Sequence, residues 1–211
     1  MIRYLIWDAG GTLFDTYPAT VQACRAALRD MGQSPPGQDV VLRLVRQSRA
    51  HAMRVLAHSY ALDAAVLTAR FQARYADIAP QQQPPFPGVV DICRAMCACG
   101  GQNFIITHRS WAALQTLLRV HRMRADFTAC ITRDDAYPRK PDPTSTLALL
   151  TDHHLDATRG LVIGDRDLDI QAGRAAGLRT CFLGTAPHLT PADLEITDYA
   201  QLQHWIQRND K

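Results

Sequence analysis

The sequence predicts an α/β fold in which a doubly wound parallel sheet is interrupted, after its first strand, by a helical insertion. Three observations carry this prediction. Short apolar runs recur and end in polar residues or glycine, segments with helical spacing alternate with them from residue 86 onward, and residues from about 17 to 80 show helical spacing alone. The 211 residues allow one domain with a modest insertion, and 47% hydrophobic with 20% charged residues is typical of a globular protein.

The apolar runs have the length of strands and lack polar alternation, as strands buried on both faces of a sheet do. The predicted strands are Tyr4–Trp7, Phe104–Ile106, Ala129–Ile131, Leu161–Ile163 and Thr180–Leu183. The helices predicted between or after them are Val90–Cys97, Ala112–Val120, Thr144–Leu150, Ile170–Ala176 and Tyr199–Ile206. The last of these is expected to close the core and shows no evident chemistry. Because helices alternate with strands, the strands are expected to run parallel.

The insertion is predicted from three apolar stripes with gaps of three and four residues. The first begins at Val21, the second begins at Val41, and the third runs from Leu67 to Ile78. Stiff, proline-containing stretches suited to hinges bound the insertion. They are Tyr17-Pro18 and residues 81–88. The prediction is therefore a sheet domain of residues 1–16 and 85–211 and a helical domain of residues 17–84.

Charge and cysteine usage exclude several classes of function. The net charge of +3 is too small, and the arginines are too scattered, to favour nucleic acid as a partner. No apolar run approaches the roughly 18 residues of a membrane span, and the first run is too short for a signal peptide, so we expect a cytoplasmic protein. The six cysteines are expected to be free thiols in the core. This includes Cys93, Cys97 and Cys99, whose spacing lacks the paired form of zinc sites.

Polar residues follow four of the predicted strands, at the edge where open α/β sheets bind ligands. Asp8, Thr107 and Asp165 follow the first, second and fourth strands, and Lys140 lies in the loop after the third. The two carboxylates could hold a hard divalent cation such as Mg²⁺, with a backbone carbonyl and waters as further ligands. The ammonium of Lys140 and the hydroxyl of Thr107 suit a phosphate oxygen.

Four segments at these strand ends resemble the ordered motifs of the haloacid dehalogenase superfamily of hydrolases. They are Asp8-Ala9-Gly10-Gly11-Thr12-Leu13-Phe14-Asp15, Ile105-Ile106-Thr107, Arg139-Lys140-Pro141-Asp142-Pro143 and Gly164-Asp165-Arg166-Asp167-Leu168-Asp169. Each motif is weak alone, but four in the right order at strand ends are a specific signature. The resemblance covers nearly the whole chain. It implies a Rossmann-like core with the helical insertion as a cap, similar to phosphoglycolate-phosphatase-like members.

The resemblance also implies a Mg²⁺-dependent phosphatase acting on a small phosphorylated metabolite. Asp8 would attack phosphorus to give an aspartyl-phosphate that water then hydrolyses. The implied ligands of Mg²⁺ are Asp8, the backbone carbonyl of Gly10, Asp165 and, directly or through water, Asp169. The implied substrate-binding residues are Thr107, His108 and Lys140. Of these, Thr107 and Lys140 would also be catalytic, because they would clamp the transferring phosphoryl group.

Gly10 departs from the family pattern, because family phosphatases usually place a second aspartate there as the general acid and base. Such catalysis is typically worth about 10²–10⁴-fold in rate. Three explanations stay open. Another group, such as His108 or water, transfers the proton; the substrate has a good leaving group; or the protein binds a phosphorylated ligand or partner and turns over poorly. Metal-independent dehalogenases have no use for the pair Asp165 and Asp169, so dehalogenation is not expected.

Overall fold

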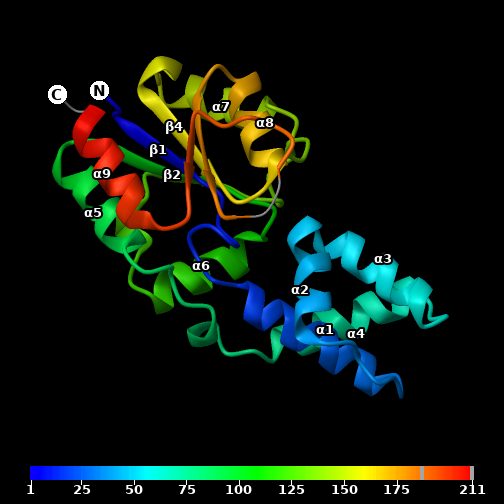
Figure 1. The fold of residues 1–211 in the computed structure, drawn as a ribbon. Coiled ribbons are helices and arrows are strands. Elements are labelled where there is room, and N and C mark those ends of the chain that lie inside the picture. The colour runs from blue at the N-terminus through cyan, green and yellow to red at the C-terminus, as the bar shows by residue number, and fades with distance from the viewer. Residues whose placement is uncertain (186–187, 210–211) are drawn as a thin grey trace. The chain divides into compact units, whose positions relative to one another are not determined.

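The structure is a computed structural model that describes residues 1–185 and 188–209 (Figure 1). Within these ranges, six strands form one sheet in the order β3-β2-β1-β4-β5-β6, and neighbouring strands run parallel. The strands are β1 (Tyr4–Trp7), β2 (Gln102–Ile106), β3 (Ala129–Ile131), β4 (Gly160–Gly164), β5 (Arg179–Leu183) and β6 (Leu194–Ile196). The strand order reverses beside β1, which confirms the predicted doubly wound α/β fold.

Helices cover both faces of this sheet. They are α5 (Val89–Ala98), α6 (Trp111–Val120), α7 (Thr144–Asp152), α8 (Asp167–Ala175) and α9 (Tyr199–Asn209), with short 3₁₀ turns at η2 (Arg124–Asp126) and η3 (Ala157–Arg159). Side chains of β1 alternate between the faces: Leu5 and Trp7 join a core with α5, α6 and α9, whereas Tyr4 and Ile6 join a core with α7. Both faces are therefore apolar, which explains the uninterrupted apolar run of this strand.

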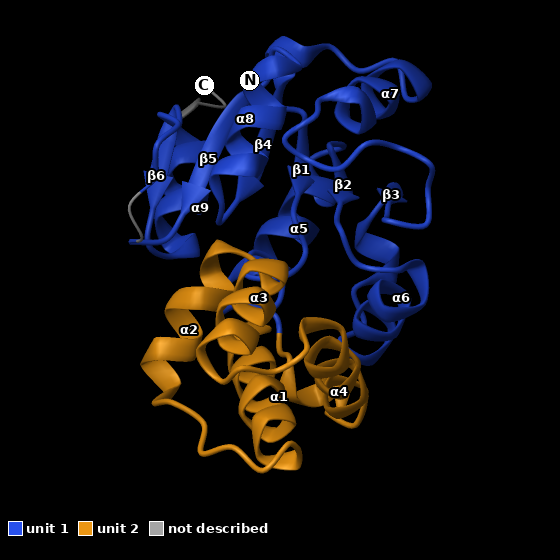
Figure 2. Ribbon diagram, turned by 90° about the vertical axis from the view of Figure 1, so that its right-hand side faces the viewer, with its two compact units in different colours: residues 1–14, 85–211 blue, residues 15–84 orange. Residues whose placement is uncertain are grey.

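The chain divides into two compact units, residues 1–14 with 85–211 and residues 15–84 (Figure 2). The first unit contains the sheet. The second unit has its own core of buried apolar side chains. Its helices are α1 (Tyr17–Asp30), α2 (Gln38–Gln47), α3 (Arg49–Ser59), α4 (Ala64–Ala76) and the 3₁₀ turn η1 (Pro80–Gln82). Over the part of the chain that the structure describes, no helix has the length and apolar character to cross a membrane.

Residues 15–84 contain one more α-helix than the three predicted stripes. Ser48 separates α2 from α3, because its backbone is extended and its side chain accepts a hydrogen bond from the backbone nitrogen of His51 at 2.9 Å. The third stripe is longer than its helix, since α4 ends before Ile78. The stretch Tyr17-Pro18 forms the first turn of α1, where proline is well tolerated.

Two further predictions for the sheet unit are corrected. Strand β6 was not predicted, because it has only three residues and its middle side chain is exposed. Cys97 and Cys99 are exposed rather than packed in the core, since they lie at the end of α5 that faces solvent, whereas Cys93 is buried. All six cysteines are free, as predicted.

A buried amide connects β1, β2, α5 and η2. The Nε1 of Trp7 donates to Oδ1 of Asn103 at 3.1 Å, and Nδ2 of Asn103 donates to the carbonyls of Cys93 at 2.8 Å and Asp126 at 3.1 Å. Asn103 is fully buried, so these bonds are shielded from water. The network fixes Trp7, which directly precedes Asp8.

Replacing this amide should destabilise the sheet unit. In Asn103→Leu, three buried polar groups lose their partner, and each loss costs about 1–3 kcal/mol. We expect the free energy of unfolding to fall by about 2–4 kcal/mol in urea denaturation. The control, Gln115→Leu, changes an exposed amide of α6 and should stay within about 0.5 kcal/mol of the unmodified protein. Equal stability of both variants would contradict a structural role for Asn103.

Candidate active site

Asp8 is the first residue after β1, and its position is fixed by the sheet. Its backbone nitrogen donates to the carbonyl of Ile163 in β4 at 3.0 Å, which continues the pairing of the two strands beyond Trp7. Its side chain is buried, with 3% of the residue exposed. The carboxylate therefore lies at the carboxyl edge of the sheet, where the strand order reverses.

Lys140 joins this carboxylate to a second one. Its Nζ lies 2.7 Å from Oδ1 of Asp8 and 2.5 Å from Oδ1 of Asp169, and it donates to the carbonyl of Ile106 at 2.8 Å. The three acceptors match the three donors of an ammonium group. The structure thus brings together a lysine and two aspartates that are far apart in the sequence, all of them buried.

The protonation of these groups follows from burial and mutual attraction. Burial raises the pKa of Asp8, but Lys140 and Arg166 outweigh burial and leave that pKa below its ordinary value. Burial lowers the pKa of Lys140, but Asp169 and Asp8 outweigh it and raise the pKa overall. The pKa of Asp169 is raised by burial and by the charge of Asp8, against the attraction of Lys140. Asp8 is therefore ionised, and Lys140 charged, at neutral pH.

A third carboxylate completes the cluster. Oxygen atoms of Asp8, Asp165 and Asp169 all lie within 4.8 Å of one another. Two glycines make room for them: the carboxylate of Asp165 occupies the space that a Cβ at Gly11 would need, and the side chain of Asp169 does the same at Gly164. Gly11 also has φ of +91°, a backbone conformation that favours glycine.

The cluster fits a divalent cation on two grounds. The three carboxylates outnumber the ammonium of Lys140 and the nearby guanidinium of Arg166, and this excess of negative charge at a largely buried site would be costly without a further cation. Oδ2 of Asp169 is also buried without a hydrogen-bond donor among the described residues. Oxygen ligands from carboxylates are those that Mg²⁺ prefers.

Thr107 ends β2 beside these residues. Its backbone nitrogen donates to the carbonyl of Ile131 at 2.9 Å, and its Oγ1 accepts a hydrogen bond from the backbone nitrogen of Arg109 at 3.2 Å. The residue is 4% exposed. Because the hydroxyl oxygen is the acceptor in this bond, its hydrogen can still be donated to a ligand.

The imidazole of His108 contacts the backbone of Lys140. Its Nε2 accepts a hydrogen bond from the backbone nitrogen of Lys140 at 3.1 Å. Burial, together with the charges of Lys140 and Arg166, lowers the pKa of His108 to about 4. The hydrogen bond assigns the ring proton to Nδ1 in a neutral imidazole at pH 7. This geometry argues against His108 as the acid that replaces the family's aspartate.

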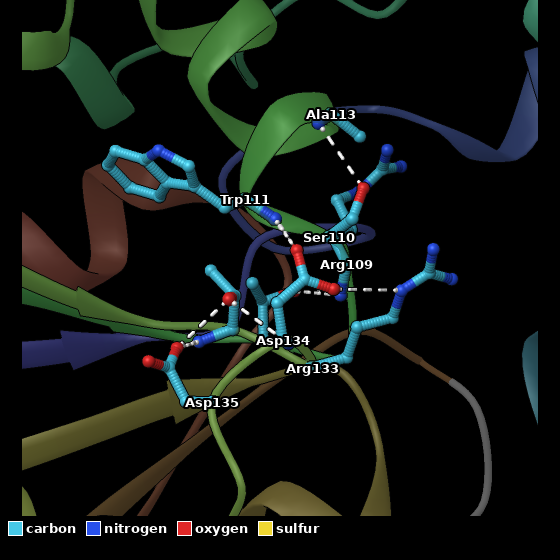
Figure 3. Close-up of polar contacts among 9 residues, drawn as sticks. Arg109, Ser110, Trp111, Ala113, Arg133, Asp134 and Asp135 are labelled. Carbon is cyan, nitrogen blue, oxygen red and sulfur yellow. Dashed lines mark hydrogen bonds and ion pairs between the residues drawn. The ribbon is translucent and has the colours of Figure 1, made fainter.

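The loop that contains Lys140 is hydrogen-bonded to the start of α6 and to the residues just before it (Figure 3). Asp134 accepts a hydrogen bond from the backbone nitrogen of Trp111 at 2.7 Å, and the backbone nitrogen of Arg133 donates to the carbonyl of Arg109 at 2.9 Å. A small pocket, partly open to solvent, lies between this loop and the strand ends. Its lining includes Thr107, His108, Arg133, Arg139 and Lys140. Asp134 leaves no signal in the sequence, because an aspartate in a loop is common and its partner is far away in the chain.

Comparison with known proteins identifies the family of the chain. A model of the haloacid dehalogenase-like hydrolase family matches residues 5–183. The chain therefore belongs to this family of hydrolases. The match ends with β5, so it leaves β6 and α9 outside.

Curated relatives of the chain are phosphatases. A phosphoglycolate phosphatase of Aliivibrio fischeri is 28% identical over 83% of this chain and 81% of its own length. An N-acetylmuramic acid 6-phosphate phosphatase of Pseudomonas aeruginosa is 26% identical over 85% of this chain and 80% of its own length. A solved structure described as a predicted phosphoglycolate phosphatase from Haemophilus somnus has a TM-score of 0.84, 17% identity and 98% coverage of both chains, which supports the fold.

The half-buried His108 should make the stability of the protein depend on pH. The folded state favours the neutral imidazole, whereas the unfolded chain takes up a proton below the ordinary pKa of 6.5. The stabilisation that the protein gains from keeping His108 neutral is therefore complete above pH 6.5, and it is lost as the pH falls toward about 4. After allowance for solvent screening of a partly exposed ring, we expect it to be about 1–2 kcal/mol.

Chemical denaturation of the unmodified protein and His108→Gln between pH 4 and 7 measures this difference. The variant should lose about 1–2 kcal/mol less stability on acidification than the unmodified protein. His58→Gln, an exposed histidine of α3, is the control and should follow the unmodified protein. Parallel pH curves for all three proteins would contradict the half-buried, neutral state of His108.

Proposed function

We propose that the protein is a Mg²⁺-dependent phosphatase that hydrolyses a small phosphorylated metabolite through an aspartyl-phosphate on Asp8. The observation that carries this proposal is the cluster of the buried Asp8, Lys140 and Asp169 with the half-buried Asp165, in which carboxylates outnumber the ammonium group. Membership of the family and the phosphatase activity named for its relatives support it.

The cation would be held by Asp8, the backbone carbonyl of Gly10 and Asp165, with Asp169 as a direct or water-mediated ligand. When bound, Mg²⁺ offsets the repulsion between the carboxylate and the phosphate dianion and stabilises charge on the phosphoryl oxygens.

The residues of the chain then account for the chemistry. Asp8 is ionised, and Lys140 holds its Oδ1, so the carboxylate is oriented before the substrate arrives. A carboxylate oxygen bonds to phosphorus as the bond to the leaving oxygen breaks, and a proton goes to that oxygen. Water then attacks the aspartyl-phosphate, which releases phosphate, restores the Asp8 carboxylate and transfers one proton to solvent. Thr107 donates its hydroxyl hydrogen to a phosphoryl oxygen.

Because residue 10 is glycine, no carboxylic acid at this position can donate a proton to the leaving oxygen. His108 is neutral and its Nε2 is occupied, so it does not supply the proton. We therefore favour a substrate with a good leaving group, or proton transfer from water. Such a substrate needs little assistance from a general acid.

The helical unit is proposed to act as a cap over the site and to select the substrate. Over residues 15–84 the sequence has eight arginines, five aspartates and no lysine or glutamate, so this unit carries the net positive charge of the chain. A positive cap suits a negatively charged, phosphorylated metabolite.

Replacing the nucleophile should abolish activity. With Mg²⁺ and an aryl phosphate, we expect turnover by the unmodified protein and a loss of at least about 10³-fold in Asp8→Asn, because an amide does not form the covalent intermediate. Circular dichroism should show an intact fold. Asp152→Asn, at the exposed end of α7, is the control and should keep full activity. Surviving activity in Asp8→Asn would place the nucleophile elsewhere, and an unmodified protein inactive on a broad panel of phosphates would favour a binding role.

Restoring an acid should change the preference between substrates. We expect Gly10→Asp to raise turnover of alkyl phosphates by about 10-fold or more and to change that of aryl phosphates much less, because only the poor alkoxide leaving group needs a proton. The ratio of kcat/KM for the two substrate types measures this effect. If alkyl turnover does not rise, the missing acid is not the limiting factor.

A further inference from the structure

The C-terminal helix contributes a buried hydroxyl to the loop that follows Asp8. Tyr199, the first residue of α9, donates a hydrogen bond from its Oη to the backbone carbonyl of Thr12 at 2.7 Å. Its ring lies between Trp7, at 5.8 Å between ring centroids, and Phe86, at 6.4 Å. The residue is 3% exposed. Tyr199 lies outside the matched range 5–183, so the family resemblance assigns it no role.

Thr12 connects this bond to the acidic cluster. Its Oγ1 donates to Oδ1 of Asp165 at 3.1 Å. On the preceding residue, Gly11, the Asp165 carboxylate occupies the place of a Cβ, so this loop and that carboxylate fit closely together. Because Tyr199 fixes the carbonyl of Thr12, it also fixes the backbone from which the Thr12 hydroxyl reaches Asp165. Two hydrogen bonds in series therefore link α9 to a carboxylate of the cluster.

We propose that Tyr199 is a positioning residue of the metal site, which acts through Thr12 to hold the Asp165 carboxylate in the orientation that binds Mg²⁺. The inference rests on the proposed function, since it assumes that the cluster takes Mg²⁺. Removing a partner that orients a metal ligand typically weakens metal binding by about 10–100-fold. Tyr199 acts one bond further away, so its effect is smaller than that of Thr12.

The test measures Mg²⁺ binding without substrate, by isothermal titration calorimetry on the full chain. Tyr199→Phe removes the hydroxyl and keeps the ring between Trp7 and Phe86. We expect it to bind Mg²⁺ about 3–10-fold more weakly than the unmodified protein, and Thr12→Val about 10-fold or more weakly. The double variant should bind no more weakly than Thr12→Val alone, because the two bonds act in series.

The chain offers a matched control for each substitution. Tyr4 is buried in β1 and donates from its Oη to the carbonyl of Asp156 at 2.9 Å, at the end of the strand opposite Asp8. Thr180 is buried and donates from its Oγ1 to Asp193 at 3.0 Å. We expect Tyr4→Phe and Thr180→Val to lower the melting temperature as the test variants do, but to keep Mg²⁺ affinity within about 2-fold.

The outcomes separate this inference from the proposed function. If the unmodified protein binds Mg²⁺ and Tyr199→Phe binds it equally well, the inference fails alone. It also fails if Tyr4→Phe weakens binding as much as Tyr199→Phe does. If Tyr199→Phe does not fold, the inference is overturned instead by a Thr12→Val variant that binds Mg²⁺ as tightly as the unmodified protein. If the unmodified protein binds no Mg²⁺, the proposed function fails and this inference fails with it.

Discussion

The buried ammonium of Lys140 is the interaction on which the site depends. It contacts Asp8 after β1, Asp169 in α8 and the carbonyl of Ile106 in β2, so one cation ties together three elements of the sheet unit. Without it, two buried carboxylates would face each other with only the charge of Arg166 nearby, which is far more costly than a paired charge. The ammonium balances one of the three carboxylates of the cluster, and the remaining negative charge suits the proposed cation.

The same four residues of β1 build the core and place Asp8, the proposed nucleophile. Their side chains alternate between two apolar cores, and their backbone pairs with β2 and β4 on either side. A strand held this tightly leaves little freedom to the next residue, Asp8, whose nitrogen continues the pairing. Rigidity at the strand end therefore orients the carboxylate, and an open α/β sheet supplies that rigidity where ligands bind.

Most of the sheet and the family motifs could be predicted from the sequence, because both leave local patterns. Apolar runs mark strands β1 to β5, and the motifs mark their ends, where Asp8, Lys140, Asp165 and Asp169 are found together. Partners distant in the sequence leave no such pattern. The bond from His108 to the Lys140 backbone, and that from Tyr199 to Thr12, depend on how loops approach one another. Strand β6 was missed because its three residues include the exposed Glu195 and therefore form no apolar run.

The site has the charged and polar groups that suit a phosphoryl group, but it lacks the carboxylic acid that family phosphatases usually place at the position of Gly10. The carboxylates, the ammonium and the Thr107 hydroxyl suit a cation and a phosphoryl group. Gly10 removes the acid that would make the rate insensitive to the leaving group. Since binding and proton transfer are separate contributions to the barrier, the loss of one leaves the other intact. In the proposed reaction, the basicity of the leaving oxygen would then select among substrates that the site binds equally well, so chemistry at phosphorus would set specificity together with the shape of the site.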